Sequence, residues 1–285
     1  MQDGRVRLAT WNVNSVVARL PRLHDWLDEV EPDVLCLQEI KTTTEAFPDD
    51  GLTSRGYEVA VTGEGRWNGV ALLSRIGLAD VSPGFPNQPG WANPPPEADA
   101  DALFHAVADP VIEARAVGAT CGPIRVWSLY VPNGRTPDSP HYAYKLDWLA
   151  AFRDATRTEL ATAAAADSSF AVCGDFNVAP TDDDVWDIGA FAASTHVTEP
   201  ERAALTALRE LGLHDVVPRP LKYDRPFTYW DYRAGMFHKN LGMRIDLVYA
   251  DERAAGAVRD AYVDRNARKG TGPSDHAPVV VDLDL

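Results

Sequence analysis

The amino-acid sequence predicts an α/β sandwich, in which two β-sheets pack face to face and helices cover their outer sides. Short runs of β-branched and aliphatic residues recur along all 285 residues, and segments with helical spacing lie between only some of them. Because helices do not alternate strictly with strands, a Rossmann-type parallel sheet fits poorly. No shift in composition marks a domain boundary, so we expect a single domain that covers residues 1–285.

Seven segments have the composition of β-strands. They are rich in β-branched and aliphatic residues and are bounded by Gly, Pro, Asn or Asp, which favour turns. In chain order they are VRLAT (6–10), DVLCLQ (33–38), GVALLS (69–74), RVWSLYV (125–131), FAVCG (170–174), RIDLVYA (244–250) and APVVVDL (277–283).

Three segments carry apolar residues at helical spacing. Residues 20–30 include Pro21, which is tolerated in the first turn of a helix. Residues 141–165 form the longest of these segments, and residues 200–213 end near Gly212, a favourable C-terminal cap. The stretch from Pro83 to Pro110 is rich in Pro, Asp and Ala, and we expect it to be a long surface excursion.

The formal net charge of −15 counts against a nucleic-acid-binding protein, because phosphate binding favours a basic surface. Net charge does not locate charge, however, and an acidic body can carry a locally basic rim. The three cysteines, Cys36, Cys121 and Cys173, lack a CxxC spacing and are interpreted as buried free thiols. No apolar run is long enough for a membrane span, and no signal core precedes the first strand, so we expect a cytoplasmic protein.

Polar residues lie at the ends of the predicted strands. We expect these strand ends to meet at one edge of the sandwich and to form one pocket. The residues are Asn12, Asn14, Glu39, Asn68, Tyr130, Asn133, Asp175, Asn177, Asp246, Asp275 and His276.

These residue types suit hydrolysis of a phosphodiester. Glu39, with Asp275 and Asn12 nearby, would hold a magnesium ion, because oxygen ligands select magnesium or manganese over zinc. Asp175 would orient or deprotonate the attacking water.

An imidazole beside a buried carboxylate can stabilise phosphate oxygens, and His276 with Asp246 is the candidate pair. Taken singly, an Asp-Phe-Asn turn or an Asp-His pair is more often structural, so the prediction depends on their combination. The remaining histidines show no ligand spacing and are interpreted as structural: His24, His105, His141, His196, His214 and His238.

Eight motifs occur in one order over nearly the whole chain: TWNVNS (10–15), LQE (37–39), NGVALLS (68–74), YVPNG (130–134), GDFN (174–177), TYWDYR (228–233), RIDL (244–247) and SDHAPV (274–279). In this order they resemble the exonuclease III family of abasic-site endonucleases, within the endonuclease/exonuclease/phosphatase superfamily. The resemblance implies the four-layered α/β sandwich, with two packed mixed β-sheets flanked by helices. GDFN and SDH are shared across the superfamily, whereas TYWDYR and RIDL point to the DNA-repair branch.

The resemblance also implies residue roles. Glu39 would be the principal metal ligand, with Asn12 and Asp275 beside it and Asn14 close by. Tyr130 and Asn177 would contact the phosphate. An apolar pocket would take a flipped-out baseless sugar, and the matching positions are Tyr229, Trp230 and Met243. From their places beside the strand-end motifs, Asn68 and Arg135 are further candidate substrate-binding residues.

The implied activity is magnesium-dependent hydrolysis of the DNA backbone 5′ to abasic sites, with 3′–5′ exonuclease and 3′-end-trimming activity in base excision repair. Manganese would be a possible substitute for magnesium. The implied partner is double-stranded DNA with an abasic site or a 3′ end, and we expect a monomer.

Two alternatives stay open. Another superfamily phosphoesterase, such as a sphingomyelinase, an inositol-phosphate phosphatase or a non-specific deoxyribonuclease, would suit the acidic charge, although TYWDYR would then have no purpose. A non-catalytic binding protein would be expected to lose metal-binding and water-activating groups first, and these are present.

Basic residues lie close to the site motifs, and we expect them to form a basic rim around an acidic body. Arg233 directly follows the aromatic motif, where its side chain could wedge into the duplex. The full set is Arg135, Arg233, Lys239, Arg244, Arg268 and Lys269.

Overall fold

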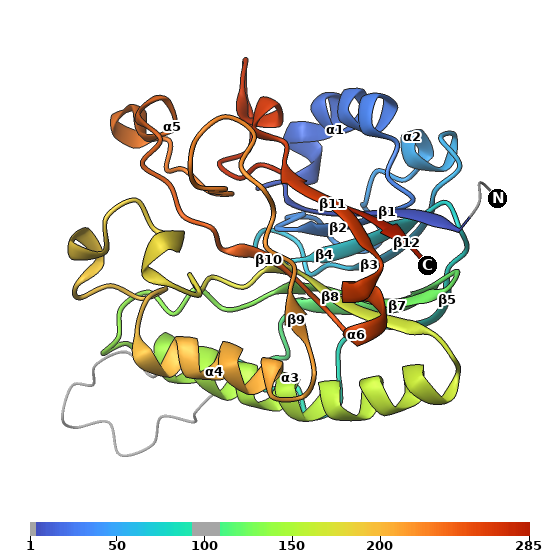
Figure 1. The fold of residues 1–285 in the computed structure, drawn as a ribbon, viewed down its shortest axis with the longest axis horizontal. Coiled ribbons are helices and arrows are strands. Elements are labelled where there is room, and N and C mark those ends of the chain that lie inside the picture. Colours follow the sequence, from blue (N-terminus) through green and yellow to red (C-terminus); the bar gives the residue numbers. More distant parts are fainter. Residues whose placement is uncertain (1–3, 93–108) are drawn as a thin grey trace.

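The computed structural model describes residues 4–92 and 109–285, and it contains two six-stranded β-sheets (Figure 1). The first sheet has, in spatial order, β11 (Val258–Val263), β12 (Val279–Asp284), β1 (Arg5–Asn12), β2 (Val34–Gln38), β4 (Val70–Ser74) and β3 (Glu58–Thr62). The second has β5 (Ala79–Ser82), β6 (Ala116–Cys121), β7 (Ile124–Tyr130), β8 (Ser169–Asp175), β10 (Asp246–Ala250) and β9 (His214–Asp215).

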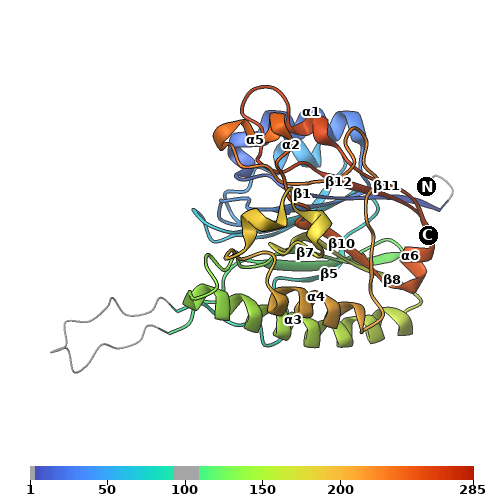
Figure 2. The ribbon, with the colours of Figure 1, turned by 60° about the vertical axis from the view of Figure 1, so that its left-hand side comes forward.

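Helices cover the outer face of each sheet. The helices are α1 (Val16–Val30), α2 (Asp50–Thr53), α3 (Pro140–Ala165), α4 (Glu199–Arg209), α5 (Met236–Lys239) and α6 (Glu252–Gly256), and short 3₁₀ turns occupy 182–184, 188–191, 233–235 and 265–268. Helices α1 and α2 lie on the side of the first sheet, and α3 and α4 on the side of the second (Figure 2). This confirms the four-layered α/β sandwich. Within the described ranges, no helix has the length and apolar character needed to cross a bilayer.

The apolar core has one layer between the sheets and one beneath each set of helices. Every residue of β2 and of β8 is buried, and strands buried on both faces are near-continuous apolar runs. Cys36, Val126 and Cys173 pack between the sheets. On the outer side, Trp148 and Phe152 of α3 stack with ring centroids 5.7 Å apart and pack against the second sheet.

Both sheets are mixed, and each contains one parallel pair that matters for the site. In the first sheet β1 runs parallel to β2, which places Asn12 opposite Gln38. In the second, β7 runs parallel to β8, which places Tyr130 opposite Asp175. Parallel neighbours bring their carboxyl ends to the same edge of a sheet, so the polar residues at these strand ends lie side by side.

The seven predicted strands and three predicted helices are present, with small shifts in their bounds. Helix α4 ends earlier than predicted, at Arg209, and Gly212 (φ 96°) serves the turn that follows, which brings buried Leu213 back toward the sheet. Strands β3, β5, β6, β9 and β11 were not predicted. The predicted excursion from Pro83 to Pro110 falls mostly on residues 93–108, which lie outside the described residues. The three cysteines are free and buried, as predicted.

Candidate active site

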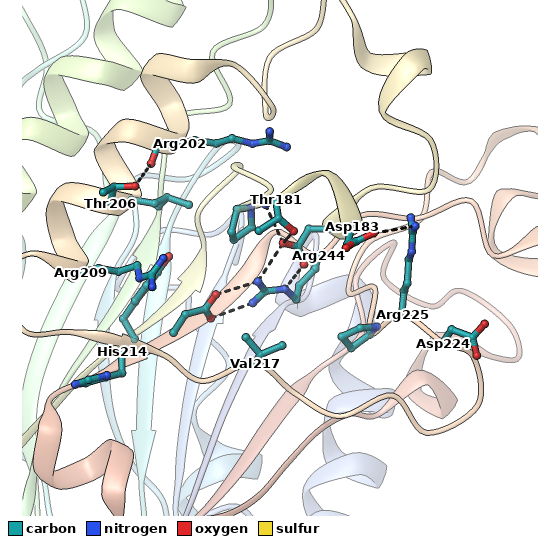
Figure 3. Close-up of a pocket in the computed structure, with 16 residues that line it drawn as sticks. Thr181, Asp183, Arg202, Thr206, Arg209, His214, Val217, Asp224, Arg225 and Arg244 are labelled. Carbon is teal, nitrogen blue, oxygen red and sulfur yellow. Dashed lines mark hydrogen bonds and ion pairs between the residues drawn. The ribbon is translucent and has the colours of Figure 1, made fainter.

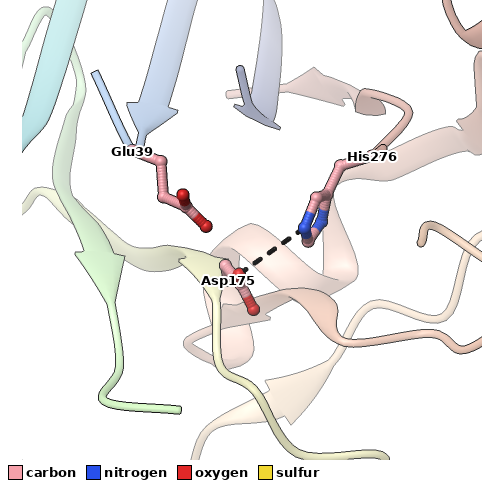
Figure 4. A group of neighbouring side chains, drawn as sticks. All are labelled: Glu39, Asp175 and His276. Atoms are coloured by element: carbon pink, nitrogen blue, oxygen red, sulfur yellow. Dashed lines mark ion pairs between the residues drawn. The ribbon is translucent and has the colours of Figure 1, made fainter. Parts of the chain in front are cut away.

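The carboxyl ends of β1, β2 and β8 meet at one end of the sandwich, together with the start of β10. Glu39 directly follows β2, Asp175 ends β8, and Asp246 pairs with Asp175 across the antiparallel β8–β10 ladder. Glu39, Asp175 and His276 point toward one another, and their possible ligand atoms all lie within 4.8 Å of one another (Figure 4). The predicted convergence of these residues is therefore found.

Glu39 is held between an amide and an ammonium group. The Asn12 amide nitrogen donates to Glu39 Oε1 at 2.9 Å and to Asp175 Oδ2 at 2.9 Å, and Lys41 Nζ lies 2.8 Å from Glu39 Oε2. Burial alone would raise the pKa of Glu39, but Lys41 and Asn12 outweigh it and lower the pKa below its usual value. The backbone of Glu39 is in the left-handed region (φ 49°), a conformation that costs a non-glycine residue roughly 1–2 kcal/mol and that clusters at functional sites.

His276 forms a buried pair with Asp246. The ring Nδ1 lies 2.8 Å from Asp246 Oδ2, and Nε2 lies 3.9 Å from Asp175 Oδ2. Burial would lower the pKa of His276, but Asp246, Asp175 and Asp275 raise it to about 10. His276 is therefore an imidazolium at neutral pH, with one N–H directed toward Asp175.

Asp175 is buried among like charges. Desolvation, together with the carboxylates of Asp246 and Glu39, raises the pKa of Asp175 to about 7, although His276 opposes this shift. A pKa near neutrality is suited to a general base, since such a group can both accept and release a proton at the working pH.

Asn177 is fixed by neighbouring loops. Its backbone N–H donates to Asp175 Oδ1 at 2.9 Å, its amide nitrogen donates to Val131 O at 3.0 Å, and Asn133 donates to its amide oxygen at 3.0 Å. Tyr130 lies between Arg115, whose guanidinium is 4.9 Å from the ring centroid, and Glu39. Burial and the Glu39 carboxylate raise the pKa of Tyr130, so the phenol is neutral and can donate a hydrogen bond.

Asn12 and Asp275, the two other residues predicted for the metal site, are held by hydrogen bonds at its edge. Asn12 directs its amide nitrogen toward the carboxylates, while its oxygen accepts from Asn14 N at 3.0 Å, so it supports the cluster and offers it no oxygen. Asp275 is outside the close trio; its Oδ1 accepts from the Asn14 amide at 3.0 Å. Asn68 donates to Glu64 and, at 2.9 Å, to Glu113, which occupies its amide away from the trio.

Comparisons with known proteins agree with this geometry. Residues 9–276 match the model of the Endonuclease/Exonuclease/phosphatase family. The chain belongs to the exonuclease III/AP endonuclease branch of this family.

Three relatives illustrate the match. An AP endonuclease structure from Archaeoglobus fulgidus shares 33% identity with a TM-score of 0.85, covering 98% of this chain and 100% of the other. A 3′ phosphatase from Neisseria, bound to a product DNA hairpin, has the same identity, TM-score and coverage. Exodeoxyribonuclease III of Haemophilus influenzae is 28% identical over 96% of this chain and 98% of its own.

Membership in the exonuclease III/AP endonuclease family makes the chain a hydrolase of that type, and the family typically uses a divalent metal ion. The residues of this site fit such an ion. The lowered pKa of Glu39 keeps that carboxylate ionised, whereas the raised pKa of His276 keeps its ring protonated and unable to bind a cation. The oxygens of Glu39 and Asp175 remain as donors, and hard oxygen donors suit magnesium.

A pocket of about 540 Å³ adjoins the exonuclease III-type site, since Tyr229 lines it and lies 4.9 Å from His276 between ring centroids. Tyr229 and Met243 line it as predicted, but Trp230 does not. The indole of Trp230 is buried in the core, edge-on to Phe237 at 5.3 Å, so its predicted place in the pocket was wrong. The other lining residues include Asn133, Arg135, Trp186, Phe191, His196 and Arg233.

A larger cavity, of about 710 Å³, lies beside α4 and β9 and is lined by Arg202, Arg209 and Arg244 among others (Figure 3). Arg244 donates to Asp184 at 2.6 Å and to Asp215 at 2.9 Å. These carboxylates raise the pKa of Arg244 despite its burial. Arg244 was predicted to belong to the basic rim, and this prediction was wrong: its charge is buried and more than neutralised.

Several cations near the site have no carboxylate partner among the described residues. Arg22 donates to the backbone oxygens of Ala267 (2.9 Å) and Thr271 (3.1 Å), and Arg19 donates to the Tyr232 hydroxyl at 2.9 Å. Most other arginines in the described ranges form ion pairs. The set is Arg19, Arg22, Arg265 and Lys269, and we call it the basic patch; Arg268, which was predicted for the basic rim, is buried and donates to the Trp230 backbone oxygen at 3.2 Å.

Three features of the site were not predicted. Lys41 bridges Glu39 and Asn14, although its position two residues after Glu39 was a possible signal. His196, interpreted as structural, lines the pocket (φ 80°) and its Nδ1 lies 2.5 Å from the backbone oxygen of Asn177. Arg19 belongs to a helix far from the other patch residues in sequence, so no local pattern could have indicated it.

Proposed function

We propose that the protein is a magnesium-dependent DNA phosphodiesterase that cleaves the backbone 5′ to abasic sites and trims 3′ ends. The supporting observation is the arrangement of the ionised Glu39, the near-neutral base Asp175 and the imidazolium of His276 beside an aromatic pocket. A phosphate seated between them would meet a metal-holding carboxylate on one side and a hydrogen-bond donor on the other.

A magnesium ion at Glu39 would neutralise charge that develops on the phosphate oxygens. Asp175 orients the attacking water and accepts its proton, because its pKa lies near neutrality. The His276 imidazolium, kept charged by Asp246, donates toward a phosphate oxygen as negative charge accumulates there. Tyr130 and Asn177 add neutral donors from the second sheet.

The pocket lined by Tyr229 and Met243 would receive a baseless sugar, since flipping costs least where pairing is already lost. The relatives support both branches of the activity: one is an AP endonuclease, and another is a 3′ phosphatase bound to DNA. The basic patch and Arg135, which lines the pocket, would hold the phosphates of the duplex.

The deciding experiment offers three labelled duplexes in parallel: one with a single abasic analogue, one with a 3′-phosphate and one with a recessed 3′-hydroxyl. Magnesium should support cleavage of all three, excess chelator should abolish it, and Glu39→Ala should raise the magnesium concentration required. Asp175→Asn should lower kcat by about 10²–10⁴, whereas the exposed Asp154→Asn on α3 should leave it unchanged.

Sphingomyelin and an inositol phosphate are offered to the same preparations. Turnover of either, with none of the three duplexes cleaved, would show that the protein is a different superfamily phosphoesterase. Cleavage at 3′ ends with an intact abasic strand would restrict the activity to 3′-end processing.

A further inference from the structure

A fully buried ion pair lies directly behind the asparagines of the site. Lys145 belongs to α3 and Glu201 to α4, two helices that run side by side beneath the second sheet (Figure 1). Both side chains are 0% exposed and they contact each other through Lys145 Nζ and Glu201 Oε1. Neither residue reaches the pocket or the carboxylates, so the proposed reaction does not use them directly.

The Lys145 ammonium joins two loops of the site. Its Nζ donates to the backbone oxygen of Asn177 at 2.7 Å and to that of Asn133 at 3.2 Å. These loops follow β8 and β7, and their two asparagine side chains hydrogen-bond each other at 3.0 Å. Because the donors of one ammonium reach both backbones, the separation of Asn133 and Asn177 is fixed from behind.

Glu201 fixes a third segment. Its Oε1 accepts from Thr195 Oγ1 at 2.6 Å and from His196 N at 2.9 Å, and its Oε2 accepts from Thr198 N at 3.0 Å within a capping box. The His196 ring in turn contacts the Asn177 backbone oxygen. The start of α4, the wall of the pocket and the Asn177 loop are therefore linked by one network of hydrogen bonds.

An ion pair at a core position carries a free-energy cost, because both charges lose their hydration. Two charges withdrawn from water are destabilising unless they pair well, and apolar residues of similar volume are often as stable. Burial lowers the pKa of Lys145, whereas Lys145 and the surrounding donors hold the pKa of Glu201 at about 2 despite burial.

We propose that Lys145 and Glu201 are positioning residues that set Asn177 and Asn133 at the geometry required for the scissile phosphate. This inference rests on the proposed function. It assigns the pair a role in the rate of the chemical step, since displacement of a phosphate-contacting group by about 1 Å can cost 10²-fold in rate.

The test replaces both charges together, as Lys145→Met with Glu201→Gln, so that no buried ion is left unpaired. The matched control is Arg125→Met with Glu159→Gln, which removes an ion pair (2.9 Å) that joins the same helix to β7 at the far end from Tyr130. Single-turnover cleavage, DNA affinity and thermal unfolding are measured for both. We expect at least a tenfold loss of the single-turnover rate in the first double variant only, with DNA affinity changed less than threefold.

A second readout does not depend on activity. In protein labelled with ¹⁵N at asparagine, the side-chain amide signals of Asn133 and Asn177 should shift or broaden in the Lys145/Glu201 double variant and stay in place in the control. If that double variant does not fold, Thr195→Val is tested instead. It removes the hydroxyl that hydrogen-bonds Lys145, Glu201 and the Asn133 backbone oxygen, and it leaves no buried charge unpaired. It should shift the same asparagine signals and slow cleavage.

An unchanged rate together with unchanged asparagine signals would overturn the positioning role. So would an equal loss of rate in the control. A wild-type protein that cleaves none of the DNA substrates would instead refute the proposed function, and the asparagine signals would still decide whether the pair fixes the two loops.

Discussion

At the scale of single residues, the site contains two groups with raised pKa values, Asp175 and His276. The raised pKa of Asp175, about 7, means that its carboxylate form, the form that accepts a proton, is lost as pH falls through that value. The raised pKa of His276, about 10, means that its charged form is lost as pH rises through that value. A magnesium ion beside Asp175 would favour the carboxylate and would therefore move the acidic limb below 7.

We therefore expect a bell-shaped dependence of kcat/KM on pH, with an acidic limb below about 7 in saturating magnesium and an alkaline limb near 10. His276→Gln should remove the alkaline limb and lower the plateau. A pH series on the abasic duplex measures both limbs. A wild-type profile that falls already between pH 7 and 9 would contradict the assignment of His276 as an imidazolium.

Arg233 illustrates how exposure and pairing set what a residue can do. Its side chain is 86% exposed and pairs with Asp231, at 2.5 Å from Nη2, on the rim of the pocket. We expect Arg233→Ala to weaken binding of abasic duplex several-fold and to spare intact duplex, because a wedge is needed only where a nucleotide leaves the stack. Titration of both duplexes checks this, with Arg153→Ala, another arginine paired with a nearby aspartate, as the control.

Equal losses on the two duplexes would make Arg233 a plain phosphate contact. No loss on either would make it a solvated surface residue.

At the scale of elements, the start of α4 couples acid stability to the site. Glu201 has a pKa of about 2 in the folded state against an ordinary 4.5, so the stability that it contributes is present above about 4.5 and is lost as pH falls toward 2. We expect the wild-type melting temperature to fall across this window more steeply than that of Lys145→Met with Glu201→Gln. Parallel slopes from pH 5 to 2.5 would contradict the pairing.

The elements that sequence predicts well are those whose residues face apolar surroundings on both sides. Strands β2, β4, β8 and β10 are buried throughout, and an unbroken aliphatic run is typical of such a strand. Strand β5, at a sheet edge, is mostly exposed, and β9 has only two residues, so composition gives no signal for either. The end of α4 depends on the burial of Leu213 in the core, which is a tertiary constraint that the local sequence does not show.

The same distinction holds within the site. Glu39, Asp175, Asp246 and His276 were predictable because each ends or begins a strand of clear pattern. The positions of Trp230 and Arg244 were not, since an aromatic or a charged residue one or two places from a site residue can face either side of the chain. Lys145 lies inside a long helix, and nothing in its sequence neighbourhood distinguishes it from a solvated lysine.

At the scale of the whole molecule, the net charge of −15 and the basic patch make opposite contributions to DNA binding. Repulsion by the acidic body is screened by salt, and so is attraction by the patch. We expect log K for duplex DNA to fall with log salt by about 0.9 per phosphate contacted, and Arg22→Ala or Lys269→Ala each to flatten this slope by about one unit. Arg157→Ala, an exposed change on α3, is the control. An unchanged slope in both patch variants would place the DNA elsewhere.

The order of strands in the first sheet has a consequence for biosynthesis. Strand β1 pairs in the finished sheet with β12, and these are the first and last strands in chain order among the described residues. During synthesis β1 therefore has one unpaired edge until β12 has been made, and His276 lies just before that strand. A chain synthesised only as far as β11 therefore lacks both His276 and the strand that covers this edge of β1, and an unpaired strand edge favours aggregation.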